Sequence, residues 1–163
     1  MNTEQRLRIR KATQADALRI GQLSIDAGLS DDDEPTTTLE PMDDDHTWIV
    51  IVDQADAIAG AAYFGPEGHS DRVWNLYFLA VDAGGRGTGA GSQLVQWVET
   101  NLRDRGEADA KLLLIETSSV ESFEPTRAFY RGLGYTEEAR IREYYGQGDD
   151  KIVYWKLLHP PLR

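Results

Sequence analysis

Apolar and polar residues along this chain follow two periodicities, one typical of strands and one typical of helices. Runs of strand character are predicted at residues 7–10, 47–52, 57–64, 73–81, 111–117, 135–144 and 152–158. Helix signals and the helical spacing of apolar residues predict three helices, from the residues after Thr13 to about residue 27, over residues 92–105 and over residues 125–133. The order is β-α-(α)-β-β-β-α-β-α-β-β, which predicts a mixed α/β fold.

Turn residues and helix caps refine this order. Thr13 and Asp16 have the spacing of a capping box, so the first helix is expected to open there. Residues 53–56 and 65–68 predict turns, which makes the first half of the sheet antiparallel. The bracketed element is an optional short helix within the acidic, proline-containing residues 29–45.

Two of the predicted strands carry further information on burial. The continuous run Leu112-Leu113-Leu114-Ile115 predicts a strand that is buried on both faces. In residues 73–81 the apolar side chains alternate, which leaves Asn75 and Tyr77 on the polar face.

Length and composition narrow the class of protein. At 163 residues the chain is expected to form one domain, residues 1–163. It has no cysteine, which excludes a disulfide scaffold, a cysteine nucleophile and a thiolate metal site. No run reaches the roughly 18 apolar residues of a membrane span, and the N-terminus lacks the pattern of a signal peptide. We therefore expect a cytoplasmic protein with no membrane partner.

The net charge of −11 is unevenly distributed. Between Arg19 and Arg72 there is no Lys or Arg, and the interval contains 13 acidic residues. Nucleic acid is therefore not an expected partner, because phosphate backbones bind basic surfaces. Two interpretations of the interval remain open. The acids form solvated loops, or they attract a cationic ligand.

A glycine-rich loop between an apolar strand and a helix is the main candidate for chemistry. It contains Gly84-Gly85-Arg86-Gly87-Thr88-Gly89-Ala90-Gly91. Glycines allow close approach of the backbone to a ligand, and a helix start presents unpaired N–H groups at the positive end of its dipole. This arrangement predicts a phosphate-binding site.

Three kinds of phosphate ligand are candidates for this loop. A nucleoside triphosphate is disfavoured because no lysine follows the glycines as in a Walker loop. A dinucleotide fits the literal pattern G-x-G-x-x-G/A at residues 85–90, with Glu116 available for a ribose. That fingerprint normally opens a parallel sheet, however, whereas hairpin-linked strands are predicted before this loop.

The third kind follows from a resemblance to a known family. Arg86-x-x-Gly89-x-Gly91 and the later segment Phe129-Tyr130-Arg131-Gly132-Leu133-Gly134-Tyr135 resemble the two motifs of the GNAT superfamily of acetyl-CoA-dependent N-acetyltransferases. The predicted element order matches that family nearly from end to end. The resemblance implies a single GNAT-like domain with a central, splayed, mostly antiparallel sheet flanked by helices.

The resemblance also implies roles for particular residues. The backbone of the preceding strand would hold the pantetheine arm and thioester of acetyl-CoA, and the loop would hold its pyrophosphate. The implied cofactor-binding residues are Leu79, Ala80, Val81, Arg86, Gly87, Thr88, Gly89, Ala90, Gly91 and Ser92. The position of Tyr130 matches the acid that protonates the departing thiolate. The chain departs from the family before the second motif, where Phe123-Glu124-Pro125 replaces a region that often carries an asparagine.

The remaining site residues follow from the chemistry of amine acetylation. A protonated amine must lose a proton before it can attack, so a base is required. Glu116 is the candidate, since it ends an apolar strand where desolvation favours a raised pKa, although it could equally cap the following loop. Asn75 and Tyr77 are expected to line the acceptor pocket. The three histidines show no metal-binding spacing, so no metal is expected.

These observations predict an enzyme that moves an acetyl group directly from acetyl-CoA to a primary amine. The acceptor is a small molecule or a protein, and the acidic interval favours a cationic one. A non-catalytic acyl-CoA sensor is the main alternative, and a dinucleotide-dependent enzyme is the less favoured one. Family members are often homodimers, but no sequence patch marks an interface here.

Overall fold

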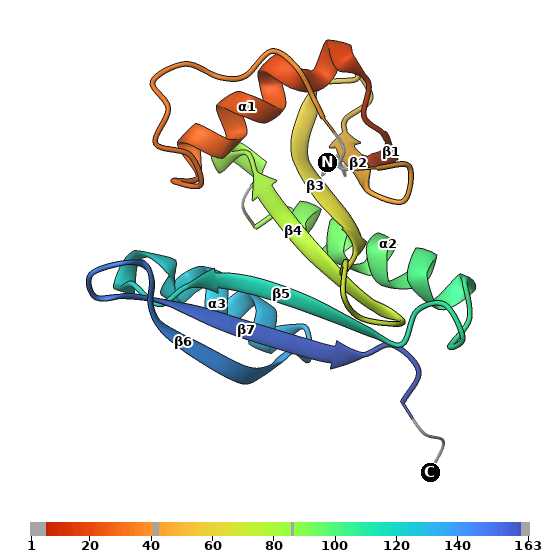
Figure 1. The fold of residues 1–163 in the computed structure, drawn as a ribbon. Helices are drawn as coiled ribbons and strands as arrows, with labels where there is room; N and C mark the ends of the chain where they lie inside the picture. Colours follow the sequence, from red (N-terminus) through yellow and green to blue (C-terminus); the bar gives the residue numbers. More distant parts are fainter. Residues whose placement is uncertain (1–5, 41–42, 86, 161–163) are drawn as a thin grey trace. The chain divides into compact units, whose positions relative to one another are not determined.

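The computed structural model describes residues 6–40, 43–85 and 87–160 (Figure 1). The strands are β1 (Arg8–Lys11), β2 (Thr47–Val52), β3 (Ile58–Pro66), β4 (Val73–Val81), β5 (Leu112–Ser118), β6 (Thr136–Gly146) and β7 (Asp149–Leu157). The helices are α1 (Ala17–Asp26), α2 (Ala90–Asp104) and α3 (Glu124–Gly132), and short 3-10 turns lie at Gln14–Asp16, Ala83–Gly85 and Glu121–Phe123.

The strands form one sheet in the order β1-β2-β3-β4-β5-β7-β6. The pairs β1–β2, β2–β3, β5–β7 and β6–β7 are antiparallel, whereas β4 and β5 run parallel because α2 connects them. The predicted mixed α/β fold with a mostly antiparallel sheet is thus confirmed.

Residue contacts divide the chain into two compact units. Unit 1 comprises Met1–Gly65 and Phe78–Val98, and unit 2 comprises Pro66–Tyr77 and Glu99–Arg163. Both β4 and α2 therefore begin in one unit and end in the other. The expectation of a single domain over residues 1–163 stays a prediction.

In unit 1, an apolar core and a charged network hold α1 beside the sheet. Buried residues of α1, including Ile20 and Leu23, belong to one cluster with Val50, Val52 and Ala61 of the neighbouring strands. Burying such side chains contributes about 1.5–3 kcal/mol each.

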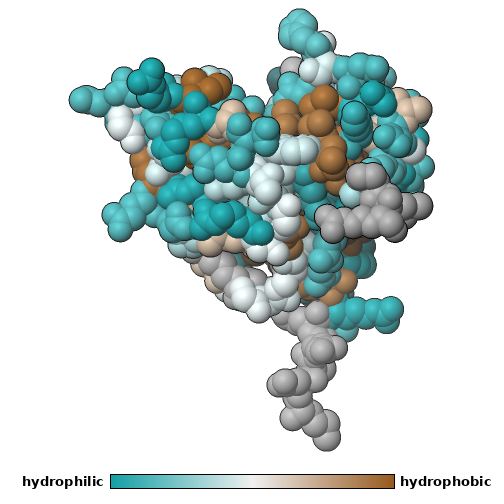
Figure 2. All heavy atoms as spheres, turned by 90° about the horizontal axis from the view of Figure 1, so that it is seen from below, coloured by the Kyte–Doolittle hydropathy of each residue, from teal (hydrophilic) through white to brown (hydrophobic). Residues whose placement is uncertain are grey.

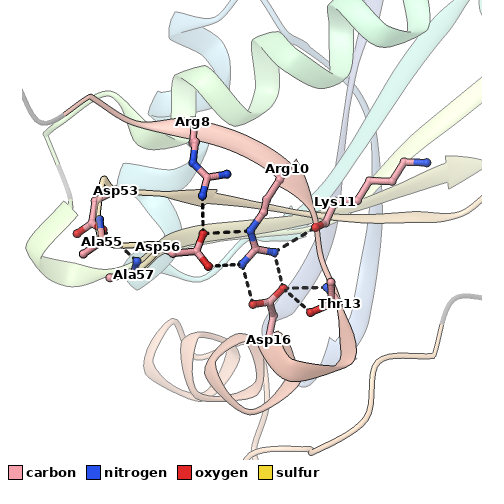
Figure 3. Close-up of polar contacts among 9 residues, drawn as sticks. All are labelled: Arg8, Arg10, Lys11, Thr13, Asp16, Asp53, Ala55, Asp56 and Ala57. Atoms are coloured by element: carbon pink, nitrogen blue, oxygen red, sulfur yellow. Dashed lines mark hydrogen bonds and ion pairs between the residues drawn. The ribbon is translucent and has the colours of Figure 1, made fainter.

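The charged network of unit 1 lies where α1 begins (Figure 3). The guanidinium of Arg10 donates to both carboxylate oxygens of Asp16, at 2.7 and 3.0 Å, and also contacts Asp56. The backbone N–H of Thr13 donates to the Asp16 carboxylate at 2.8 Å, as a capping box requires. The Arg10 hydrogen bonds, with that of Thr13, lower the pKa of Asp16 despite its burial.

In unit 2, helices pack on one face of β5 and β7. On this face the Tyr130 ring of α3 contacts the Tyr154 ring, and Glu99 of α2 accepts a hydrogen bond from Lys156. Along β5, Leu113 and Ile115 are fully buried, while the residues between them are only half-buried. The expected burial of this strand on both faces is therefore wrong, because Leu112 and Leu114 on the other face keep part of their surface exposed.

The remaining element boundaries agree closely with expectation. β2 and β4 have the predicted limits, and β6 extends two residues further, to Gly146. No helix follows α1 within residues 27–40 and 43–46, so the optional short helix is not found in these described residues. None of the helices in the described ranges is both long and apolar enough to cross a bilayer. Figure 2 shows that, on the face drawn, hydrophobic residues reach the surface in separate patches among hydrophilic ones.

Candidate functional site

The glycine loop lies in unit 1, between the end of β4 and the start of α2. Gly87 and Gly89 have φ angles of +82° and +83°, a region that side chains with a β-carbon avoid. Both glycines are exposed, and α2 starts at Ala90 with no acidic residue in its first turn. No carboxylate of that turn therefore neutralises the unpaired N–H groups and the positive dipole end, and the loop is suited to bind a phosphate group.

Asp82 anchors the beginning of this loop. Its backbone N–H donates to the carbonyl of Ala59 on β3 at 2.8 Å, and its Oδ1 accepts from the N–H of Gly84 at 2.7 Å. Its other carboxylate oxygen pairs with the guanidinium of Arg19 on α1. The Gly84 hydrogen bond and then the Arg19 charge lower the pKa of Asp82, although partial burial opposes this.

The pair of Arg19 and Asp82 is not among the residues predicted from the sequence. The segment Asp82-Ala83-Gly84 does carry a signal, since an aspartate two residues before a glycine is typical of an Asx turn. The partner on α1 could not be found from the sequence, because the two residues are 63 positions apart.

All of the predicted cofactor residues that the structure describes lie in unit 1. Leu79, Ala80 and Val81 form the end of β4, and Ala80 is buried in the core of this unit. Gly87, Thr88 and Gly89 form the loop, and Ala90, Gly91 and Ser92 form the first turn of α2. Arg86 lies outside the described residues. The roles of all these residues stay predictions.

Tyr130 lies in unit 2, on the side of α3 that packs on the sheet. Only 5% of the residue is exposed, and its ring contacts those of Phe129, Tyr135 and Tyr154 at centroid distances of 5.4, 6.3 and 6.2 Å. Burial raises the pKa of the Tyr130 phenol above its ordinary value. The phenol therefore remains protonated through the physiological range and can act as a hydrogen-bond donor.

Glu116 lies on β5 of unit 2, and a cation lies beside it. The Nζ of Lys151 is 3.0 Å from Oε1 of Glu116, and 29% of the Glu116 side chain is exposed. Burial acts to lower the pKa of Lys151, but the hydrogen bond and charge of Glu116 raise it overall. The setting of Glu116 is thus an ion pair with Lys151, whereas the sequence left open a desolvated base or a cap of the following loop.

Asn75 and Tyr77, the predicted acceptor residues, differ in exposure. Asn75 is 1% exposed and donates from Nδ2 to Oε1 of Glu67 at 2.6 Å. Its Oδ1 is buried and has no hydrogen-bond partner among the described residues. Tyr77 is 40% exposed, and its hydroxyl donates to the carbonyl of Pro66 at 3.4 Å. The two side chains are therefore tied to the end of β3 and to the residue that follows it.

The strand register of unit 2 places two of the predicted residues, Tyr77 and Glu116, at matching positions on neighbouring strands. The parallel pairing of β4 with β5 runs from Val73–Leu112 to Leu76–Ile115. Tyr77 and Glu116 are the next residues on these two strands. Two partners of these residues were not predicted: Lys151, which pairs with Glu116, and Glu67, which pairs with Asn75. Neither pair forms a recognisable sequence motif. The first is brought together by the strand register and the second by the turn after β3.

No group of three or more potential metal ligands is gathered within residues 6–40, 43–85 and 87–160.

Comparisons with known proteins identify the family. A family model described as the Acetyltransferase (GNAT) family matches residues 18–135, which is more than half of the chain. A solved structure assigned to the GNAT acetyltransferases, from Desulfovibrio desulfuricans, is 27% identical, with a TM-score of 0.83 and coverage of 94% of this chain and 100% of that one. No curated protein matches the sequence.

Two other solved structures share the fold at lower identity. An aminoglycoside 6'-N-acetyltransferase complexed with coenzyme A is 18% identical, with a TM-score of 0.74 and coverage of 96% and 99% of the two chains. The ribosomal-protein-S18-alanine N-acetyltransferase from Escherichia coli is 17% identical, with a TM-score of 0.69 and 96% of each chain covered. The match of the family model agrees with the glycine loop and with the element order, and this chain belongs to the GNAT family of acetyltransferases.

Proposed function

We propose that this protein transfers an acetyl group from acetyl-CoA directly to a primary amine. The observation that carries the proposal is the pair of left-handed glycines, Gly87 and Gly89, before an acid-free first turn of α2. Both lie within the residues that the family model matches. Their N–H groups would bind the pyrophosphate of coenzyme A, with Arg86 as its charge partner.

The proposed reaction needs no covalent enzyme intermediate. The amine nitrogen attacks the thioester carbon, a C–N bond forms, and the C–S bond then breaks to release the thiolate of coenzyme A. The oxyanion formed in between would accept a hydrogen bond from the backbone of residues 79–81. A protonated amine loses two protons over the whole reaction: one goes to the base before the attack, and the other ends on the thiolate of coenzyme A.

Tyr130 is proposed as the donor to the departing thiolate. Its raised pKa keeps the hydroxyl protonated, and no hydrogen bond of this hydroxyl is found among the described residues. A hydrogen bond from a phenol in a buried setting would stabilise the charge that develops on sulfur.

Glu116 is proposed as the group that accepts the proton of the amine, directly or through water. Its Oε1 lies 3.0 Å from the ammonium of Lys151, and 29% of the side chain is exposed, so water can reach the carboxylate. Asn75 and Tyr77 are proposed to line the acceptor side, where the buried Oδ1 of Asn75 offers an acceptor atom to a bound amine.

For the acceptor we propose a cationic amine, either a small molecule or a lysine or N-terminus of a protein. The acids of residues 31–34 and 43–45 are exposed in unit 1, where they contribute a negative potential. Such attraction weakens as salt rises, since the Debye length falls from about 10 Å at 0.1 M to about 3 Å at 1 M. The KM for the acceptor should accordingly increase with ionic strength.

A panel of amines tests this proposal, with acetyl-CoA as donor and release of the coenzyme A thiol as the signal. Thiol release that depends on one class of amine supports the enzyme. No release with any amine, together with tight binding of acetyl-CoA, would point to a non-catalytic sensor. A rise in melting temperature with NAD and none with acetyl-CoA would support a dinucleotide enzyme instead.

A further inference from the structure

The glycine loop begins at a residue that is fixed from three directions. Asp82 is bonded through its own N–H to β3, through Oδ1 to the N–H of Gly84, and through its second carboxylate oxygen to Arg19 of α1. The Gly84 contact closes the first turn of the loop, so it sets the direction in which the chain leaves β4. Any displacement of the Asp82 carboxylate would therefore displace the start of the loop.

The charge of Asp82 presents a problem for an anionic ligand of the same loop. No other acidic residue occurs between Asp71 and Glu99 in the sequence, so Asp82 is the acid nearest along the chain to Gly87 and Gly89. An unpaired carboxylate beside a pyrophosphate would weaken binding by repulsion. The guanidinium of Arg19 neutralises this charge and leaves Oδ1 in place to accept from Gly84.

The pair is accessible to solvent and is not part of the apolar core. The side chains of Arg19 and Asp82 are each 36% exposed. Together with Gly84 they form part of the wall of a cavity of about 580 Å³ in unit 1, next to Ile58 and Ala59. A substitution in the pair should consequently alter the loop and its charge without opening a buried cavity.

From these contacts we infer that Arg19 and Asp82 are a positioning pair for the glycine loop, through which α1 sets the affinity for coenzyme A. This inference rests on the proposed function. Neither side chain is assigned a contact with the donor. Asp82 acts by holding the N–H of Gly84, and Arg19 acts by orienting and neutralising Asp82. The pair should then affect binding of the donor and leave the chemical step unchanged.

Four variants separate the two parts of this role. Asp82→Ala removes the acceptor for Gly84, and Arg19→Gln leaves Asp82 charged and unpaired. Asp82→Asn retains an acceptor oxygen but removes the charge. The fourth variant is the double substitution of Arg19→Gln and Asp82→Asn. The matched control is Arg8→Gln, which breaks an exposed ion pair with Asp56 in the same unit.

The readouts are the Kd for coenzyme A by calorimetry and, where an acceptor is known, kcat and KM for acetyl-CoA. Asp82→Ala should raise Kd about tenfold, because the N–H of Gly84 loses its acceptor and the start of the loop is no longer held in place. Arg19→Gln should raise Kd about fivefold in low salt and less in about 1 M salt, where repulsion is screened. The double variant should bind better than Arg19→Gln alone, kcat should stay within about twofold, and Arg8→Gln should bind as wild type.

The outcomes distinguish this inference from the proposed function. If Asp82→Ala and Arg19→Gln both bind coenzyme A as tightly as wild type does, the inferred positioning role of the pair is wrong, while the proposed function stands. If the double variant binds worse than Arg19→Gln, charge neutralisation is wrong. If wild type binds no coenzyme A, both proposals are wrong. Circular dichroism of Arg19→Gln and Asp82→Asn, which remove no packed group, verifies that the comparison is made between folded proteins.

Discussion

The ammonium of Lys151 lies 3.0 Å from the carboxylate of Glu116 and 4.1 Å from the centre of the Tyr144 ring. One cation therefore stabilises the candidate base and also rests on an exposed aromatic ring. The relationship depends on the strand register of β5 and β7, in which Glu116 is opposite Val153 and Lys151 is opposite Ser118. It places the proposed proton acceptor in a charged pair at the edge of solvent.

Replacing Glu116 by glutamine tests its role as the base. Glu116→Gln keeps the shape of the side chain but cannot accept a proton, so kcat should fall about a hundredfold. The KM for acetyl-CoA should remain within about twofold, because the donor is proposed to bind elsewhere. Steady-state kinetics with the best amine of the panel measure both values. Glu121→Gln, on an exposed residue of the same unit, is the control, and equal rates for the two variants would exclude Glu116.

The substitution Tyr130→Phe distinguishes a catalytic role of the hydroxyl from a packing role of the ring. The ring contacts with Tyr135 and Tyr154 should persist, so the melting temperature should change little. Loss of the hydroxyl should lower kcat by at least about tenfold while the Kd for coenzyme A is retained. Tyr145→Phe, at a tyrosine that is 48% exposed, serves as the control. An unchanged kcat in Tyr130→Phe would mean that the ring is structural only.

The ion pair between Arg10 and Asp16 makes the free energy of unfolding depend on pH. Hydrogen bonds from Arg10 lower the pKa of Asp16 below the ordinary value, so its charged form is favoured in the folded state. The stabilisation is full above the unfolded pKa of about 3.9 and is lost as pH falls through the lower folded value. Asp16→Asn should reduce the free energy of unfolding by about 1–3 kcal/mol at neutral pH.

Urea unfolding of wild type and Asp16→Asn at about pH 7 and about pH 2 measures this effect, since the difference should shrink in acid. Asp33→Asn, in an exposed loop of the same unit, should cost less than about 0.5 kcal/mol. A difference between wild type and Asp16→Asn that is the same at both pH values would contradict the ion-pair explanation.

Gly65 is predicted to tolerate no side chain, because a β-carbon there would overlap the imidazole of His46. The His46 side chain is only 4% exposed and its Nδ1 lies 2.6 Å from Asp43, so it has little freedom to move. Gly65→Ala should lower the free energy of unfolding by about 1–3 kcal/mol. Thermal unfolding beside Gly68→Ala, where a β-carbon meets no atom within 4 Å, provides the comparison. Equal melting temperatures would contradict the packing.

The sequence predicts the elements of this fold well where a periodic run is bounded by turn residues. The limits of β2 and β4 were correct because both runs are strongly apolar and end at polar or glycine-containing segments. The helix at Pro125 was placed within one residue of α3 at each end, since Pro125 and Gly134 mark the start and the stop.

Burial and pairing were harder to predict, because they depend on contacts between distant segments. The run 112–115 suggested two buried faces, but a run of leucines cannot show how many helices cover it. The local motif at Gly87 and Gly89 could be found, whereas the partners Arg19 of Asp82, Lys151 of Glu116 and Glu67 of Asn75 are set by tertiary packing and strand register.

The most direct test of acetyl transfer by this protein is to compare the amounts of its two expected products, free coenzyme A thiol and N-acetylated amine. Wild type and Gly89→Val would be incubated with acetyl-CoA and the best amine of the panel, and both free thiol and N-acetylated amine would be quantified by mass spectrometry. The proposal predicts equal amounts of the two products with wild type. It also predicts a strong loss with Gly89→Val at limiting acetyl-CoA, because valine cannot adopt the φ of this position without strain. Thiol release without acetylated amine, or no product with any amine, would contradict the proposed function.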